Sequence, residues 1–139
     1  MSRTETTIDR GLLDTSVVIS LEALQPEQLP EEPAISAITL AELAAGPHAT
    51  DDERERARRQ DRLQRVEAAL DPLPFDAAAA RAYAQVFAAT RAADRKPRGA
   101  RAADLMIAAM AIANDLPLFT RNPTDFDHLG EIGLDVHAV

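Results

Sequence analysis

The segment GLLDTSVVIS (residues 11–20) joins the pattern of a short buried strand to that of a helix, with an acid between them. Two leucines lead into Asp14, and three apolar residues, at 17–19, follow shortly after it. Asp14 can cap the next helix by accepting a hydrogen bond from an unpaired backbone amide. Whether this carboxylate has a further role depends on where the other acids of the chain fall.

The composition is that of a globular protein. The 139 residues fit a single domain spanning 1–139, and 46% of them are hydrophobic. No apolar run approaches the ~20 residues that cross a membrane, and the polar start MSRTETTIDR lacks the apolar core of a signal peptide. The absence of cysteine excludes disulfides, thiol nucleophiles and cysteine-based metal sites. A cytoplasmic protein with no membrane partner is therefore expected.

The formal net charge of −8 disfavours nucleic-acid binding through a broad positive surface. The basic residues are nearly all arginines, with Lys96 as the single lysine, and arginine binds phosphates in bidentate geometry. Local arginine clusters therefore matter more than the total charge. The mixed charges at 51–65 are interpreted as a solvated helix face, in which Glu55 and Arg59 lie one turn apart and pair.

Short apolar runs alternate with longer helical patterns along the chain. Strands are predicted at 11–14, 34–37, 72–75, 116–120 and 134–139, and helices at 14–24, 38–46, 50–70, from 76 onward and at 100–115. Gly46 predicts a left-handed helix end, and Thr50 with Glu53 matches a capping box. The alternation predicts an α/β fold with a parallel sheet and helices on both faces.

Polar groups follow several of these predicted strands. Asp14 ends the first strand, Glu42 lies one or two turns into the helix after the second, and Asp104 lies in the first turns of the buried helix at 100–115. Asn122 and Asp125 come directly after the strand at 116–120. Because the carboxyl ends of parallel strands share one edge of a sheet, all five side chains are expected at a common rim.

Each acid also has a purely structural interpretation. Asp14 can be an N-cap, and Thr39 with Glu42 matches a capping box. Asp104 can stabilise a helix N-terminus through the helix dipole, and Asp125 can serve the short helix that follows its strand. Independent caps have no reason to converge on one edge, so their convergence favours a functional cluster.

Clustered carboxylates require a cation. Two carboxylates ~4 Å apart repel each other by about 4 kcal/mol at an effective dielectric constant near 20. They must protonate, separate or bind a cation, and Arg101 or Arg121 can neutralise only part of the charge. Mg²⁺ suits such oxygen ligands, keeps several waters and meets phosphate oxygens, so the cluster predicts a magnesium site, with Mn²⁺ as the substitute.

Four segments together resemble those of PIN-domain nucleases, and more narrowly those of VapC toxins from bacterial toxin–antitoxin pairs. They are LLDTSVVI (12–19), ITLAEL (38–43), ARAADLMIAAMA (100–111) and LFTRNPTDF (118–126), in the order and approximate spacing of that family. The resemblance implies a PIN-like three-layer α/β sandwich, in which a mostly parallel sheet of four to five short strands has helices on both faces. It also implies Mg²⁺- or Mn²⁺-dependent RNA cleavage, a homodimer and a VapB-type antitoxin partner.

The resemblance also implies roles for individual residues. Asp14, Glu42 and Asp104 match the first three acids of the family, and Asp14 and Asp104 would hold the metal with Glu42 bound directly or through water. Many relatives have an acid where this chain has Asn122, so either the Asn122 amide oxygen or Asp125 fills the fourth position.

Other polar side chains are assigned supporting roles around this rim. Three hydroxyls can fix the carboxylates or a phosphate by hydrogen bonds, namely those of Thr15, Ser16 and Thr120. Arg98 and Arg101, with Arg121 opposite, are interpreted as lining the path of the RNA backbone. The alternative for the first two is a solvated basic linker.

Two other classes of function compete with a nuclease. Metal-free histidine catalysis needs two converging imidazoles, and only His128 falls near the predicted rim. The stronger alternative is a catalytically weak PIN-like module that binds a partner protein or RNA without cutting it, which the asparagine at Asn122 would suit.

Overall fold

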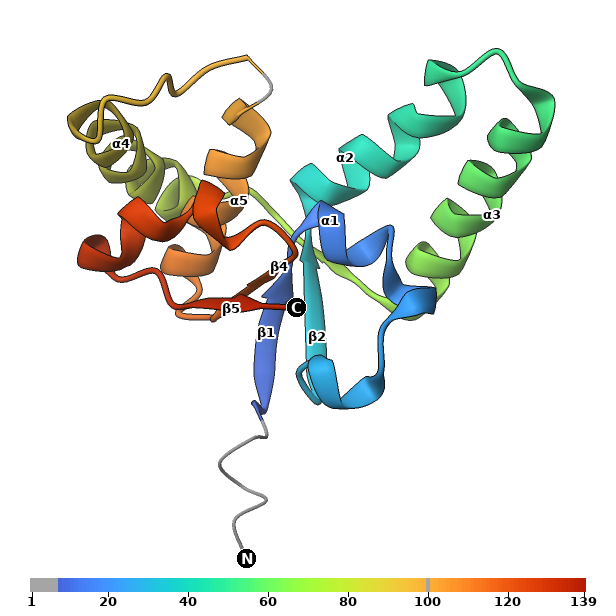
Figure 1. Cartoon of the computed structure of the whole chain (residues 1–139), viewed down its shortest axis with the longest axis horizontal. Helices are drawn as coiled ribbons and strands as arrows, with labels where there is room; N and C mark the ends of the chain where they lie inside the picture. The colour runs from blue at the N-terminus through green and yellow to red at the C-terminus, as the bar shows by residue number, and fades with distance from the viewer. Residues whose placement is uncertain (1–7, 100) are drawn as a thin grey trace, which may run out of the picture.

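The sheet contains five parallel strands. The computed structural model describes residues 8–99 and 101–139, and the strands lie in the order β3-β2-β1-β4-β5 (Figure 1). The strands are β1 (Arg10–Leu13), β2 (Glu32–Ser36), β3 (Pro72–Leu73), β4 (Leu118–Thr120) and β5 (Val136–Ala138). The predicted parallel α/β sheet is thereby confirmed, with all five strands at the predicted places and most of them shorter.

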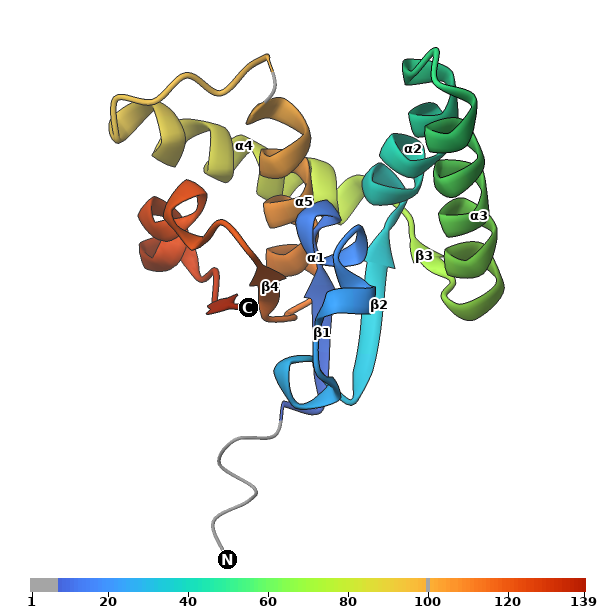
Figure 2. The ribbon, with the colours of Figure 1, turned by 45° about the vertical axis from the view of Figure 1, so that its right-hand side comes forward.

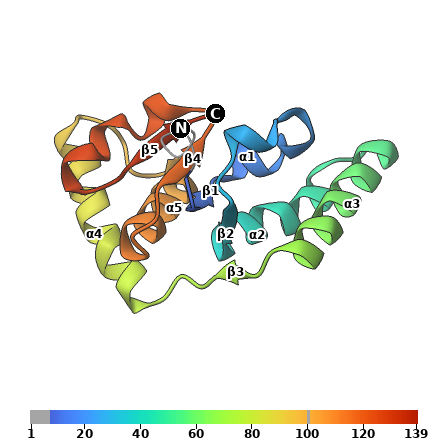
Figure 3. The ribbon, with the colours of Figure 1, turned by 90° about the horizontal axis from the view of Figure 1, so that it is seen from below.

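Helices cover both faces of this sheet. They are α1 (Thr15–Val18), α2 (Ala37–Ala45), α3 (Glu53–Ala69), α4 (Ala77–Ala92) and α5 (Arg101–Ala113), with 3₁₀ turns η2 (Leu21–Ala23), η3 (Pro26–Gln28), η4 (Gly46–Ala49), η5 (Pro123–Asp125) and η6 (Asp127–Ile132). Figures 2 and 3 show α4 and α5 on one side of the central strands and α2 and α3 on the other. This arrangement is the expected three-layer sandwich.

Successive side chains of the central strands feed two separate cores. Leu12 packs into the cluster that contains the buried face of α5, while Leu13 packs with Val17, Val66 and other residues on the opposite side. The alternation follows from the two-residue period of a strand. Because both faces of the sheet are buried at β1, the sequence of this strand is a continuous apolar run. The acid that ends the run lies at the edge of the sheet.

Gly11 permits the close approach of β1 and β4. A Cβ atom at this position would overlap the ring of Phe119 and lie 3.1 Å from Cγ of Pro30. Any side chain at position 11 would therefore displace an aromatic ring that is itself 3% exposed and part of the second core. No helix of the described residues is long and apolar enough to cross a membrane.

The helix predicted at 14–24 is wrong in extent. The α-helical turn α1 ends at Val18 and is followed by the separate 3₁₀ turn η2. Three consecutive β-branched residues, at 17–19, have low helix propensity, and Ser20 after them favours a turn. The segment after Asp14 therefore forms a single α-helical turn and then a 3₁₀ turn, not one continuous helix.

The predicted left-handed end at Gly46 is also wrong. Gly46 has right-handed dihedrals (φ −52°, ψ −48°), and the chain continues directly into η4. A residue before proline normally avoids this conformation because its Cβ crowds the proline ring, and glycine has no Cβ. The chain therefore turns from α2 to α3 without a left-handed residue at Gly46.

The start of α3 is capped by Asp52 rather than by the predicted Thr50 and Glu53 pair. The Asp52 carboxylate accepts a hydrogen bond from the Arg54 amide, while the Thr50 hydroxyl accepts one from the Asp52 amide. Aspartate is as good an N-cap as threonine or better, and Asp52 lies one residue before the helix.

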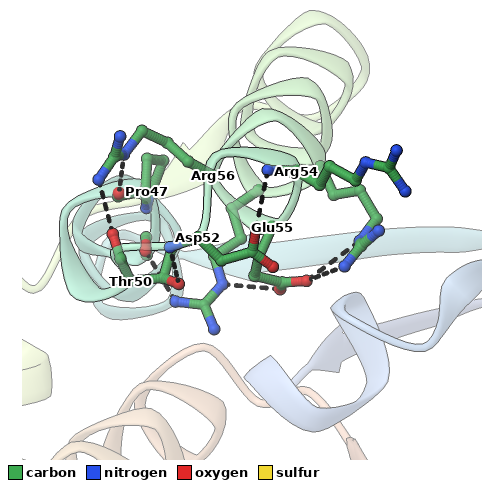
Figure 4. Close-up of polar contacts among 9 residues, drawn as sticks. Pro47, Thr50, Asp52, Arg54, Glu55 and Arg56 are labelled. Atoms are coloured by element: carbon green, nitrogen blue, oxygen red, sulfur yellow. Dashed lines mark hydrogen bonds and ion pairs between the residues drawn. The ribbon is translucent and has the colours of Figure 1, made fainter.

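Arginines of α3 hold the corner between α2 and α3, as Figure 4 shows. Arg56 donates to the backbone oxygens of Pro47 (3.1 Å) and Thr50 (2.7 Å). Arg59 pairs with Glu55 at 2.9 Å, one turn away, as predicted. The positive charges of this helix are thus largely used within the protein.

Candidate active site

Asp14 leaves β1 at the centre of the sheet and is almost fully buried, at 3% exposure. Its amide donates to the Phe119 carbonyl of β4 (3.0 Å), which fixes the backbone at the strand end. One carboxylate oxygen accepts hydrogen bonds from the Val17 amide (3.1 Å) and the Ser16 hydroxyl (2.6 Å). The capping interpretation of Asp14 is therefore correct, and the same group also lies at the edge of the sheet.

Ser16 connects the ends of two neighbouring strands. Its hydroxyl donates to Asp14 and accepts a hydrogen bond from the Arg121 amide at 3.1 Å. The strands β1 and β4 pair with each other although β2 and β3 continue the sheet on the other side of β1, so the strand order reverses here. Ligands of open α/β sheets bind at such reversals, outside the carboxyl ends of the strands.

Glu42 projects from the second turn of α2 and is held by a chain of hydroxyl groups. Thr15 donates to Glu42 Oε1 at 2.5 Å, so the 3.0 Å contact between Thr15 and Thr39 requires Thr39 as the donor. Ser36 in turn donates to Thr39 at 3.3 Å. Hydrogen bonds in such a chain polarise one another, which strengthens the last bond to the carboxylate.

The capping box predicted for Thr39 and Glu42 is wrong. The N-cap of α2 is Ser36, whose hydroxyl accepts a hydrogen bond from the Thr39 amide at 2.9 Å. Since Ser36 caps the helix, the Glu42 carboxylate is not needed for that purpose, and it turns toward Thr15 of α1 instead.

Asp104 lies in the first turn of α5 and carries the clearest electrostatic signature of the site. Partial burial, followed by the negative charges of Asp14, Glu42 and Asp125, raises its pKa from 3.8 to about 6, and Arg101 opposes the shift. Carboxylates from three other segments therefore lie near enough to Asp104 to act on it at this rim. Strongly shifted carboxyl groups of this kind are typical of functional sites.

The two candidates for the fourth position differ in their surroundings. Asp125 in η5 lines, together with Asp104, a cavity of about 560 Å³. Asn122 is exposed, and its backbone amide donates to the buried hydroxyl of Thr120 at 3.0 Å. The Asn122 side chain caps no helix by a hydrogen bond.

The same cavity brings the predicted arginines to the acids. Arg98 and Arg101 line it beside Asp104 and Asp125, whereas Arg121 is exposed at the end of β4 and anchored through its backbone amide to Ser16. The lining of this cavity thus contains both positive groups and carboxylates.

The donor set suits a hydrated divalent cation. Among residues 8–99 and 101–139, no three histidine, aspartate or glutamate side chains lie close enough together to enclose a metal ion directly. The carboxylates are near enough to raise the pKa of Asp104, and one arginine only partly offsets them. Mg²⁺ takes few protein ligands and keeps several waters, so carboxylates at this spacing can hold it through its water shell.

A polar network that the sequence did not suggest holds the loop carrying Asp125. Arg95, just after α4, donates to the Thr124 carbonyl (3.0 Å), to Asp127 (3.0 Å) and to His128 Nδ1 (3.0 Å). Since arginine only donates, His128 Nδ1 must accept, and its Nε2–H donates to Thr90 at 2.9 Å. Burial and the nearby Arg95 lower the pKa of His128.

This histidine is therefore a structural group rather than a catalytic base. Its two ring nitrogens are both used within the protein, which disfavours the metal-free histidine mechanism. No local sequence pattern could reveal the network, because its partners are separated by about thirty residues in the chain.

Comparisons with known proteins agree with this geometry. A family model described as PIN domain matches residues 11–132. The chain is 37% identical over 120 residues to Ribonuclease VapC5 of Mycobacterium tuberculosis, across 84% of this chain and 86% of the relative. It is 38% identical over 109 residues to Ribonuclease VapC8 of the same species, across 78% of this chain and 96% of the relative.

Solved structures give the same result. The crystal structure of VapBC-5 from Mycobacterium tuberculosis, a member of the VapBC family of toxin–antitoxin systems, matches with a TM-score of 0.82 at 34% identity. That match covers 94% of this chain and 98% of the other. VapBC2 from Rickettsia felis shares the fold, with a TM-score of 0.75 at 22% identity over the same proportions of the two chains.

Proposed function

The chain belongs to the PIN-domain family, and on that basis we propose that it is a divalent-metal-dependent endoribonuclease that acts as the toxin of a toxin–antitoxin pair. Its relatives are named ribonucleases, and the structures it matches include toxin–antitoxin complexes. We treat residues 1–139 as a single catalytic domain that works in the cytoplasm, where its RNA substrates are. The observation that carries the proposal is the raised pKa of Asp104, to which partial burial and the negative charges of Asp14, Glu42 and Asp125 contribute.

Asp14 and Asp104 would hold Mg²⁺, or Mn²⁺ in its place, with Glu42 bound directly or through water. When bound, the ion would lower the pKa of its water and neutralise charge on the phosphate. The burial of Asp14 and the hydrogen bonds from Ser16 and Val17 fix the first carboxylate before any ligand arrives.

Glu42 would orient the attacking water. Its Oε1 accepts from Thr15, whereas its Oε2 accepts no hydrogen bond from residues 8–99 or 101–139 and can accept one from water. The water oxygen bonds to phosphorus and the P–O3′ bond breaks, which would leave a 5′-phosphate and a 3′-hydroxyl. The Thr15 contact limits the rotation of this carboxylate, so that the water is positioned rather than merely bound.

Asp125 is the better candidate for the fourth position. It shares a cavity with Asp104 and contributes to the pKa shift of that group. Asn122 is neutral, and its backbone amide donates a hydrogen bond to the Thr120 hydroxyl. We therefore assign Asp125 to a second, substrate-dependent metal position and Asn122 to a supporting contact.

The RNA backbone would enter along Arg98 and Arg101, with Arg121 on the other side of the acids. The first two line the cavity that contains Asp104, which supports a phosphate path over a solvated linker. Thr15, Ser16 and Thr120 have their hydroxyls engaged with protein groups, so their role is to position the carboxylates and the strand end.

We also propose a VapB-type antitoxin and a second copy of the chain as partners. The antitoxin is supported by the relatives, whose structures are described as toxin–antitoxin systems, and the second copy by the resemblance to the VapC family. An antitoxin that covers the acidic rim would block the metal and the RNA path together.

The test is cleavage of total RNA by the purified protein with Mg²⁺ and with EDTA. Cleavage should require the metal, and Asp14→Asn and Asp104→Asn should each abolish it while leaving the fold intact by circular dichroism. Asp71→Asn removes an exposed acid between α3 and β3 and serves as the matched control. Full activity in both site variants would refute the assignment.

Binding without cleavage would support the other class of function. If the wild type binds Mg²⁺ by calorimetry and binds RNA, yet cuts no RNA, the chain is a PIN-like binding module. Sequencing RNA ends after brief induction, with Asp14→Asn for comparison, identifies the substrate when cleavage occurs.

A further inference from the structure

A second cavity adjoins the acidic one on the side of α4. It has a volume of about 420 Å³, within the ~300–1,000 Å³ of ordinary ligand sites, and its lining includes Phe87, Arg91 and Lys96. Four residues line both cavities: Asp94, Arg95, Lys96 and Arg98. The two cavities therefore adjoin each other, and their combined lining extends from Asp104 of α5 to Phe87 and Arg91 of α4.

Of the four positive side chains that line this second cavity, Arg95 is used within the protein, where it pairs with Asp127. Arg91, Lys96 and Arg98 form no ion pair with any residue in the described ranges 8–99 and 101–139. The contrast with α3 is clear, because Arg58 and Arg59 both pair with Glu55 there. Unneutralised cations beside a nuclease centre are suited to phosphates.

Phe87 adds an aromatic face to the same cavity. It is 39% exposed. Among the described residues, the other large apolar side chain that is exposed to this degree is Ile19, directly after α1. The Phe87 ring lies 6.2 Å from the Tyr83 ring at an interplanar angle of 55°, which supports it from one side. An aromatic ring set among cations is the usual platform on which single-stranded bases stack.

We propose that Phe87 stacks against a base of single-stranded RNA next to the cleaved bond, while Arg91 and Lys96 hold the adjoining phosphates. The inference rests on the proposed ribonuclease function and adds a substrate subsite to it. A second copy of the chain fits this surface poorly, because a two-fold contact centred on it would bring the unpaired cations of both copies close together.

Phe87→Leu tests the stacking contact, because it keeps apolar bulk and removes the aromatic face. The probe is a short fluorescein-labelled oligouridine RNA, measured by anisotropy with EDTA present so that it is not cut. Phe87→Leu should bind about tenfold more weakly than the wild type, and Phe87→Tyr should bind like the wild type. Ile19→Ala, at the other exposed apolar side chain, should leave binding unchanged.

An abasic oligonucleotide with the same phosphates separates stacking from charge. The wild type and Phe87→Leu should bind it equally. Arg91→Gln and Lys96→Gln should each lower the salt dependence of oligouridine binding by about one unit of slope, and Arg54→Gln, in α3, should not.

Three results would overturn the inference. One is that Phe87→Leu binds oligouridine as tightly as the wild type does. Another is that Phe87→Leu loses as much affinity for the abasic oligonucleotide as for oligouridine. The third is a change of oligomeric state in Phe87→Leu by light scattering, with RNA binding restored at concentrations where the oligomer re-forms. Failure of the wild type to bind or cut any RNA would instead refute the ribonuclease proposal itself.

Discussion

The backbone amide of Arg121 donates a 3.1 Å hydrogen bond to the side chain of Ser16, 105 positions earlier in the chain. The same hydroxyl donates to Asp14 at 2.6 Å. One serine therefore fixes both the carboxylate that ends β1 and the backbone that leaves β4.

Ser16→Ala should lower RNA cleavage and Mg²⁺ affinity by about 10–100-fold, the usual cost of losing a hydrogen bond to a metal-binding group. Ser16→Thr keeps the hydroxyl and should retain most of both. Calorimetric Mg²⁺ titration and cleavage rates measure the effect, and identical values for Ser16→Ala and the wild type would contradict it.

Asp104 should make the metal-free protein less stable as the pH rises. Its folded pKa is about 6 and its ordinary value is 3.8, so between these values the folded state holds a proton that the unfolded state has released. This group's contribution to the free energy of unfolding therefore falls as the pH rises through that window. Urea denaturation in EDTA should show the fall in the wild type, and a smaller one in Asp104→Asn.

Added Mg²⁺ provides the control for this prediction. At neutral pH it should stabilise the wild type by mass action and leave Asp104→Asn nearly unaffected. A pH dependence that is the same in both proteins would mean that the proton is not held at Asp104.

His128 should give the opposite pH dependence. Burial, and then Arg95, lower its folded pKa below 6.5, so the unfolded state takes up a proton first as the pH falls. The stability that it contributes is complete above pH 6.5 and is lost as the pH falls through the lowered folded pKa. Urea denaturation of Asp104→Asn, with and without the further change His128→Gln, isolates this effect. If both variants lose the same stability at acid pH, the loss belongs to a group other than His128.

Charge reversal at Arg98 and Arg101 should weaken RNA binding and lower its salt slope by roughly two units, because two phosphate contacts are lost. Arg54→Glu with Arg81→Glu changes the same number of charges at exposed positions elsewhere and is the matched control. If the two double variants lose the same RNA affinity, the change in net charge alone accounts for the weaker binding.

Gly11→Ala should destabilise the protein by about 1–3 kcal/mol, because the new methyl group overlaps the Phe119 ring. The double variant Gly11→Ala with Phe119→Leu should be more stable than the sum of the two single changes predicts. If the double variant loses as much stability toward urea as the two single variants together, the Phe119 ring moves aside in Gly11→Ala at no cost in free energy.

The strands and the positions of the acids could be predicted from the sequence because both depend on local patterns. Apolar runs bounded by polar residues identify β1 and β4, and the acid after the first run is Asp14. The parallel topology then requires the polar groups to gather at one edge. This explains why the charges of Asp14, Glu42 and Asp125 act on Asp104 in the structure.

Helix ends and supporting contacts could not be predicted in the same way. The caps at Ser36 and Asp52 were missed because several hydroxyl and acid residues precede each helix, and only the fold selects one of them. The hydrogen bond from Thr15 to Glu42 and the network around Arg95 join residues far apart in sequence. Such pairs become visible only when the layers are assembled.

The bridge between Ser16 and Arg121 has a consequence for the timing of synthesis. A ribosome synthesises every residue up to Pro117 before β4 exists, and until then Asp14 lacks the strand that anchors its backbone. A growing chain should therefore be harmless to the RNA that encodes it. Only a polypeptide that extends past β4 would be able to cleave RNA. An inhibitor protein synthesised at the same time can therefore already be present when this activity appears.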